Sequence, residues 1–290
     1  MAFNNPYQAF VDGFARLLTE GAALSPADPT PPARPPVATG APTALIFAPH
    51  PDDEVIIGAL PLRLQRELNI NVVNVAVTLG SRLDRRAERW QELKHACAYI
   101  GFGLVTPSEK GLEGINLAAR KHDPKQWAAS VEAIAAILTA HRPAIVFAPH
   151  AEDWNQTHVG THQLVLDALT QCPGLACRVV ETEFWGAMDA PNLMVESSPA
   201  EVADLVAALA LHAGEVARNP FHLRLPAWMI DNVRRGAEVV GGQGAAAPRF
   251  TFATLYRLRR WADGRLEEVL ERGRALSSRD DLSPLFLNPT

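Results

Sequence analysis

The sequence predicts an α/β fold in which a mostly parallel sheet carries helices on both faces. Short apolar runs, typical of buried strands, alternate with amphipathic helical stretches along most of the chain. Repetition of the order strand, helix, strand implies right-handed crossovers, which place helices on both sides of a parallel sheet. The 290 residues, of which 48% are hydrophobic and 20% charged, suffice for one substantial core, and we expect one main domain.

The main domain follows a different N-terminal segment, residues 1–42. Phe10, Phe14, Leu17 and Leu18 recur at helical spacing and predict a helical arm, after which proline dominates the composition and predicts an extended linker. The domain itself is expected over 43–290. Pro61 suits the first turn of a helix, where its missing N–H costs nothing. The first half predicts strands over 43–48, 72–78 and 103–106 and helices over 60–69 and 85–100.

Proline and glycine mark the boundaries of the later elements. Gly101 suits a left-handed helix cap, Pro124 opens a helix, and Pro143 precedes a strongly apolar strand. The expected elements are helices over 124–141 and 157–169 and strands over 144–148 and 178–184. From about residue 190 we expect a substrate-facing C-terminal extension with helices over 199–217 and 226–240 and an alternating segment over 250–256.

Composition excludes several classes of function. With 32 acidic and 27 basic side chains, the formal charge of −5 argues against an electrostatic grip on nucleic acid. No apolar run reaches the roughly 18 residues of a membrane span, and the first residues lack the basic segment of a secretion signal. Cys97, Cys172 and Cys177 form no CxxC pair, so we expect buried, reduced cysteines and a cytoplasmic protein. Homo-oligomer formation stays open.

One local sequence pattern occurs twice. Phe-Ala-Pro-His-Pro-Asp-Asp at 47–53 is echoed by Phe-Ala-Pro-His-Ala-Glu-Asp at 147–153, and each copy lies where a predicted strand ends. Ligands of open parallel sheets bind in the crevice outside the carboxyl ends of the strands. The two clusters of histidine and acidic residues are therefore expected to face one cavity.

The first cluster has the composition of a metal site. In a turn, His50 and Asp53 can hold one cation while Asp52 faces its open side. Two carboxylates and an imidazole packed together are unfavourable unless a cation joins them. Imidazole and carboxylate without thiolate suit Zn²⁺, and a catalytic zinc keeps three protein ligands. An acidic pair after a strand can also be a simple helix cap.

A second imidazole ligand can come from His150, His158 or His162. His158 lies at the helix start nearest the strand end and reaches the crevice best, whereas His162 is one turn deeper and suits packing. The competing class is a metal-binding α/β module without catalysis, since acidic pairs at strand ends also hold Mg²⁺. Two imidazoles favour zinc, because Mg²⁺ prefers oxygen ligands. Arg82, in the loop after 72–78, is either a substrate contact or a surface charge.

These residues resemble a known family. His50-Pro51-Asp52-Asp53-Glu54, then Thr-Leu-Gly-Ser-Arg at 78–82, and Asp153 five residues before His158 are similar to motifs of the N-acetylglucosaminyl-phosphatidylinositol de-N-acetylase (PIG-L, LmbE-like) family. The resemblance covers about 43–185 and extends more weakly to 240. It implies a Rossmann-like fold and a mononuclear zinc held by His50, Asp53 and His158, with Asp52 as general base.

The chain departs from this family at one position. The family's second motif usually reads Asp-x-His-Pro-Asp-His, and here Asn155 replaces its first histidine. Asn155 is expected to donate to the oxyanion or to cap the following helix. The family also uses a histidine from the C-terminal half, which the resemblance places at His222, as a substrate-binding residue alongside Arg82.

The expected reaction is hydrolysis of an N-acetyl amide on a small molecule, an amino sugar or its conjugate, which releases acetate and a free amine. Zinc would polarise the amide carbonyl and acidify a water molecule, and Asp52 would move the proton. An amidase for a larger thiol or peptide conjugate is the alternative within the hydrolases.

Overall fold

A single sheet organises the protein. Within residues 5–24, 29–33 and 36–287, which this computed structural model describes, nine strands form one sheet in the order β3-β2-β1-β4-β5-β7-β6-β9, with β8 paired to β7. Residues 1–4, 25–28, 34–35 and 288–290 lie outside the described residues. They include parts of the segment for which an N-terminal arm and a proline-rich linker are predicted.

The first five strands are parallel and confirm the predicted α/β class. They are β1 (Thr43–Ala48), β2 (Asn71–Ala76), β3 (Gly103–Val105), β4 (Ile145–Pro149) and β5 (Cys177–Thr182). Strand β1 lies between β2 and β4, with Ile46 level with Asn74 on one side and Phe147 on the other. The carboxyl ends of these strands therefore meet at one edge of the sheet.

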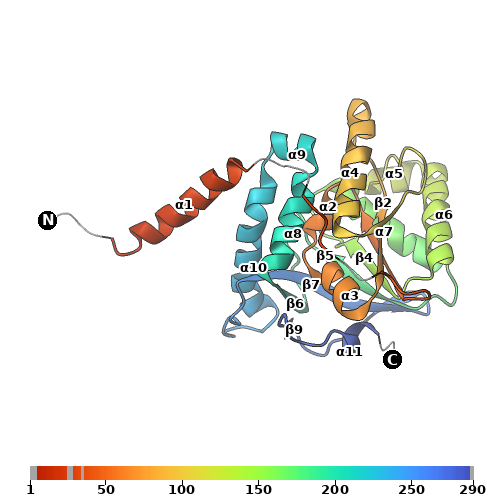
Figure 1. Cartoon of the computed structure of the whole chain (residues 1–290). Helices are drawn as coiled ribbons and strands as arrows, with labels where there is room; N and C mark the ends of the chain where they lie inside the picture. The colour runs from red at the N-terminus through yellow and green to blue at the C-terminus, as the bar shows by residue number, and fades with distance from the viewer. Residues whose placement is uncertain (1–4, 25–28, 34–35, 288–290) are drawn as a thin grey trace.

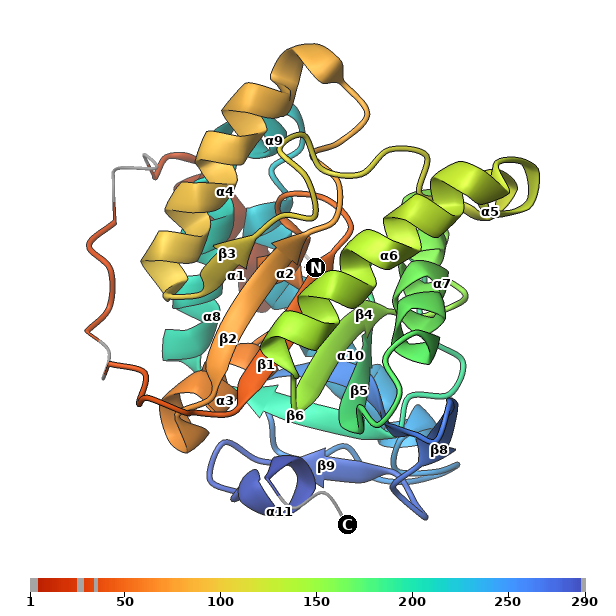
Figure 2. The same ribbon diagram turned by 90° about the vertical axis from the view of Figure 1, so that its right-hand side faces the viewer.

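Helices cover both faces (Figure 2). On one face lie α3 (Leu60–Leu68), α4 (Arg86–Ile100) and α8 (Pro199–Ala210), and on the other α6 (Pro124–His141) and α7 (Gln156–Thr170). Strand β1 supplies side chains to both layers, since Ala44 and Ile46 join the first core and Leu45 and Phe47 join the second. Because side chains of a strand alternate between its two faces and both faces are covered, β1 is apolar from Ala44 to Ala48.

The C-terminal segment continues the same sheet. Strand β7 (Phe252–Ala262) pairs antiparallel with β5 on one side and with β6 (Leu193–Ser197) on the other. It is longer than the predicted 250–256, and β6, β8 (Arg265–Glu268) and β9 (Arg274–Leu276) were not predicted. The remaining elements are α5 (Leu117–His122), α10 (Leu225–Val239), α11 (Ser283–Phe286) and the turns η1 (Leu83–Arg85) and η2 (Phe221–Arg224).

One predicted helix is wrong. The stretch 199–217 forms two helices, α8 and α9 (Ala213–Arg218), which are separated at His212. The side chain of His212 is fully buried and its Nε2 lies 2.8 Å from Glu54 Oε1. His212 is the N-cap residue of α9, so the break in the predicted helix coincides with this buried contact, which hydrophobic periodicity cannot reveal.

The arm at the N-terminus is helical as predicted. Helix α1 (Gln8–Ala22) extends away from the body of the protein (Figure 1), and Phe10, Phe14, Leu17 and Leu18 along it are exposed. In the described ranges, no helix has both the length and the apolar character needed to cross a membrane. Cys97, Cys172 and Cys177 are buried and unpaired, as predicted.

Candidate active site

The turn after β1 is shaped so that three acidic or imidazole side chains converge. Helix α2 (Asp53–Ile56) begins directly after Asp52, whose φ of 107° lies in the left-handed region. This conformation is costly for a residue with a Cβ, and such strain is typical of functional turns. The backbone N–H of Asp52 donates to Glu54 Oε2 at 2.9 Å, which helps to hold the turn.

Three donor atoms form a nearly equilateral triangle. His50 Nδ1 lies 3.2 Å from Asp53 Oδ2 and 3.2 Å from His158 Nε2, and His158 Nε2 lies 3.3 Å from Asp53 Oδ2. Zinc binds such atoms at 2.0–2.1 Å with tetrahedral geometry, which places neighbouring ligand atoms about 3.3 Å apart. In the described part of the chain, these three residues form the group whose spacing suits a metal ion. Two nitrogens and one oxygen therefore fit a zinc centre with one open position.

His158 is oriented from behind. It is fully buried near the start of α7, and its Nδ1 lies 3.7 Å from Asp153 Oδ2. The Asp153 carboxylate itself accepts hydrogen bonds from the backbone N–H groups of Asn155, Trp185 and Gly186. A carboxylate behind a histidine fixes the tautomer and direction of a metal-ligating ring. His158 is thus held with Nε2 toward His50 and Asp53.

The electrostatics of the triangle favour a cation. Burial alone would lower the pKa of His158, but the carboxylates of Asp53 and Asp153 raise it to about 10. Burial alone would raise the pKa of Asp53, but His158 and His50 hold it below its usual range. The carboxylates therefore stabilise a positive charge at this point, whether a proton or a metal ion supplies it.

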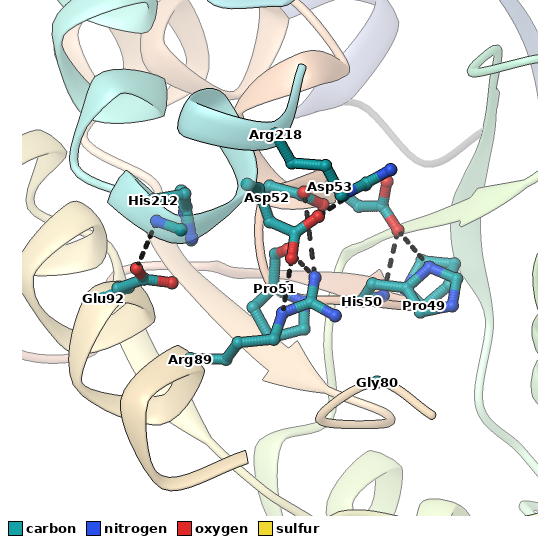
Figure 3. Close-up of polar contacts among 12 residues, drawn as sticks. Pro49, His50, Pro51, Asp52, Asp53, Gly80, Arg89, Glu92, His212 and Arg218 are labelled. Carbon is teal, nitrogen blue, oxygen red and sulfur yellow. Dashed lines mark hydrogen bonds and ion pairs between the residues drawn. The ribbon is translucent and has the colours of Figure 1, made fainter. Parts of the chain in front are cut away.

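Asp52 lies beside the triangle and is not part of it. It is 9% exposed, and burial followed by the Asp53 charge raises the pKa of Asp52 well above its usual value. Arg89, from α4, approaches it with Nη2 3.8 Å from Asp52 Oδ2 and donates to the Pro51 carbonyl at 2.8 Å (Figure 3). A raised pKa is typical of a carboxyl group that takes and returns a proton near neutral pH.

A cleft of about 360 Å³ is lined by His50, Asp52 and Asp53, with His158 buried behind them. Part of its wall comes from the segments after β1, β2, β4 and β5, where ligands of parallel sheets bind, and the rest comes from α9 and the residues up to η2. The lining side chains that bear most directly on chemistry are His50, Asp52, Asp53, Arg89, Asn155 and Arg218.

The other histidines near the strand ends do not join the triangle. His162 Nδ1 lies 2.8 Å from the Pro149 carbonyl oxygen, and His150 Nε2 lies 2.8 Å from that of Gly186. Both are buried and serve to pack the strand ends. Asn155 is the N-cap of α7, where its Oδ1 accepts from the Thr157 N–H at 2.8 Å, and it also lines the cleft.

Two predicted substrate contacts lie elsewhere. The side chain of Arg82 is 70% exposed and pairs with Asp84 at 2.6 Å, outside the set of residues that line the cleft. His222 lines a separate cavity between α1, α8 and α9. Neither Arg82 nor His222 therefore lines the cleft in this structure. Helix α4 brings Arg89 to the cleft instead, and the turn before α9 directs His212 toward the motif that follows β1.

The residues that support the cleft were not among the predicted site residues. Arg89 lies against Gly80, at which a Cβ would be 2.2 Å from Arg89 Nη1. Glu54 bridges the Asp52 N–H and the His212 side chain. His212 precedes α9, which carries Arg218, and Figure 3 labels both of these residues. Glu54 belongs to the first sequence motif, but the sequence does not reveal its partner. In the structure Glu54 is only 1% exposed, as expected for a carboxylate that is paired inside the protein.

Replacing His212 with glutamine should remove a pH-dependent part of folding stability. Burial alone would lower the pKa of His212, but Glu54 raises it above 6.5. A raised pKa in the folded state stabilises the protein fully at pH below about 6.5, and this contribution is lost as pH rises through the folded pKa. Denaturant unfolding should show a parent-minus-variant difference that shrinks between pH 5.5 and pH 9. An unchanging difference would contradict a charged pair, and exposed His122→Gln is the control.

Comparisons with known proteins bear on the same segment. Residues 45–169 match the family model described as PIG-L, GlcNAc-PI de-N-acetylase. No curated protein is similar enough to the chain to count as a match.

Solved structures share the fold. N,N'-diacetylchitobiose deacetylase from Pyrococcus horikoshii is 17% identical, covers 89% of this chain and 94% of its own, and has a TM-score of 0.52. The zinc-inhibited form of teicoplanin deacetylase is 17% identical, with coverages of 76% and 99% and a TM-score of 0.54. The 4-carboxy-2-hydroxymuconate hydratase of Pseudomonas putida KT2440 is 16% identical, with coverages of 75% and 95% and a TM-score of 0.55. The same fold thus occurs in proteins described as hydrolases and as a hydratase.

Proposed function

We propose, because residues 45–169 match the family model of GlcNAc-PI de-N-acetylases, that the protein is a zinc-dependent hydrolase of N-acetylated amino sugars or their conjugates. The observation that carries the proposal is the triangle of His50, Asp53 and His158 with Asp52 beside it in an open cleft. Two of the solved neighbours are described as deacetylases of such compounds, which supports the same substrate class. The reaction converts an N-acetyl amide and water into acetate and a free amine.

Several residues at the cleft have distinct parts in this reaction. When bound to His50, Asp53 and His158, zinc would supply a Lewis acid for the amide carbonyl and make a water molecule acidic near neutral pH. Asp52 takes the proton from the attacking water and returns it to the leaving nitrogen, as one carboxyl group can do at successive steps. Arg89 limits the negative charge around Asp52 and holds the turn through the Pro51 carbonyl.

We assign to Asn155 the role of hydrogen-bond donor to the negatively charged oxygen that forms from the amide carbonyl during the reaction. Its Oδ1 is committed to the Thr157 N–H, which leaves the Nδ2 hydrogens as the donors that this side chain can offer to the cleft. Capping of α7 and donation to substrate are therefore compatible in one residue. An amide donor also has no ionisation in the ordinary pH range, in contrast to the histidine that the family usually places here.

The test of this proposal is product analysis with the zinc-loaded full chain. On a panel of N-acetyl amino sugars that includes N-acetylglucosamine and N,N'-diacetylchitobiose, acetate and primary amine should appear in a one-to-one ratio. Amide conjugates of thiols or peptides in the same panel examine the broader amidase alternative. Hydration of 4-carboxy-2-hydroxymuconate without acetate release from any amide would overturn the proposal in favour of a hydratase.

Replacing Arg89 with alanine should lower kcat/KM by about 10–100-fold, the effect typical of residues that hold catalytic groups in place. Arg82→Ala removes an equally charged side chain that is exposed and paired with Asp84, and it should change kcat/KM by less than about twofold. Steady-state kinetics of both variants make the comparison. A raised KM for Arg82→Ala with no effect of Arg89→Ala would return the substrate contact to Arg82.

A further inference from the structure

A second cavity, of about 350 Å³, lies directly beside the cleft. The two hollows share four lining residues, which are Ile56, Trp185, Asn219 and Phe221. Ile56 ends the helix that Asp53 begins, so the shared wall starts one helical turn from a proposed zinc ligand. A molecule bound at the triangle can therefore extend into the second cavity without crossing the protein.

The second cavity differs in chemistry from the cleft. Its other walls are Phe184, Leu225, Trp228 and Arg224, so its lining is mainly aromatic and aliphatic, whereas the cleft holds carboxylates and arginines. We name this hollow the aromatic cavity. Phe184 lies between the two, since its ring packs edge-on against His158 with centroids 4.6 Å apart. One aromatic ring thus separates a proposed zinc ligand from the aromatic cavity.

Trp185 indicates that the shared wall is a binding surface. Its side chain is 58% exposed although it stands at the border of both hollows. Exposed aromatic surface around a concave, mostly apolar pocket with a few polar groups is typical of small-molecule sites. An acetyl group alone is far smaller than a cavity of 350 Å³. The cavity therefore has room for a larger part of the substrate.

We propose that the aromatic cavity binds an apolar group that the substrate carries next to its scissile amide. The inference rests on the proposed deacylation at the triangle and narrows its substrate class to amphipathic amino-sugar compounds. The apolar group has two chemical sources, an aglycone on the sugar or an acyl chain longer than acetyl. Both place hydrocarbon against Trp228 and Leu225 while the amide stays beside Asp52 and Asn155.

Four synthetic glucosaminides separate these sources. They combine a methyl or a 2-naphthyl aglycone with an N-acetyl or an N-octanoyl group, and amine release by the zinc-loaded full chain gives kcat/KM for each. Burial of hydrocarbon should raise kcat/KM about three- to fourfold for each methylene that enters the cavity. If the naphthyl compounds have a kcat/KM at least tenfold above that of the methyl compounds, the cavity binds the aglycone. If the octanoyl compounds show that gain over the acetyl compounds, the cavity binds the acyl chain. Equal kcat/KM for all four compounds overturns the inference but leaves the deacylase, whereas amine release from none overturns both.

Variants of the cavity test its location. Trp228→Ala should lower the ratio of kcat/KM between the preferred apolar compound and the methyl N-acetyl compound by about tenfold. Trp185→Ala removes an exposed side chain, which guards against loss of folding, and should lower the same ratio. Ile230→Ala, 38% exposed on the same helix as Trp228 and outside both cavities, is the matched control and should keep the ratio. A ratio that survives both tryptophan variants contradicts the assignment.

Discussion

Replacing Asp52 with asparagine should lower kcat by about 10²–10⁴-fold, the usual contribution of a positioned general base, and should leave zinc bound. Asparagine keeps the size of the side chain and removes its capacity to take a proton. Metal binding should persist because Asp52 lies beside the triangle of His50, Asp53 and His158 and supplies none of its atoms. Kinetics on the best N-acetyl substrate, with zinc measured on the same sample, test both parts.

The backbone at position 52 makes this variant informative. Its φ of 107° is unusual for residues with a Cβ, and asparagine, like aspartate, tolerates positive φ better than most. The turn should therefore keep its shape. Asp84→Asn, at an exposed carboxylate paired with Arg82, is the matched control and should keep the parent kcat. Near-normal turnover by a zinc-loaded Asp52→Asn protein would remove Asp52 from the mechanism.

The His158→Ala variant should lose its zinc and, with it, all measurable turnover. The proposed centre has three protein ligands, and removal of one imidazole leaves too few for tight binding. His158→Gln, which fills more of the buried space, guards against loss of folding. Zinc content after dialysis and circular dichroism on the same samples provide the measurement.

Neighbouring histidines supply the control for this result. His162, on the same face of α7, lies 2.8 Å from the Pro149 carbonyl oxygen and not toward the triangle, so His162→Ala should keep zinc. His150→Ala should also keep it, since His150 contacts the Gly186 carbonyl. Full zinc occupancy in His158→Ala, together with loss in either of the other two, would show that the ligand assignment is wrong.

The positions of the histidine and acidic residues after β1 and β4 were predictable, because the carboxyl ends of parallel strands lie at the same edge of a sheet. The repeated motif after β1 and β4 located His50, Asp53 and the start of α7, and the helical spacing of His158 and His162 separated the residue near the edge from the deeper one. These inferences need only strand ends and helix starts, which periodicity and proline mark well. The structure places His50, Asp53 and His158 within 3.3 Å of one another.

The supporting residues were not predictable for a physical reason. Periodicity shows that a helix has a buried face but not what that face meets. Arg89 contacts Pro51, which is 38 positions away, and His212 contacts Glu54 across 158 positions. Neither residue was among the predicted site residues, while Arg82 was favoured for its loop and His222 for a family analogy. Strand β6 was missed because its pairing partner, β7, follows 55 residues later, at Phe252 after Ser197.

Asn155 shows how one residue can satisfy two interpretations. The sequence allowed either an oxyanion donor or a helix cap, and the structure places it at the cap with its amide at the cleft. Its role toward the substrate stays a prediction. The pH profile of kcat should contain no ionisation from this position, whereas Asn155→His should introduce one.

Zinc titration of the metal-free full chain tests zinc-dependent deacetylation most directly. Acetate release from an N-acetyl amino sugar should be near zero in the chelator-treated protein and should rise in proportion to bound zinc up to one equivalent per chain. Asp52→Asn in parallel should bind the same equivalent without recovering activity. Acetate release that is unchanged when zinc is removed, or one bound equivalent of zinc with no acetate release, would contradict the account.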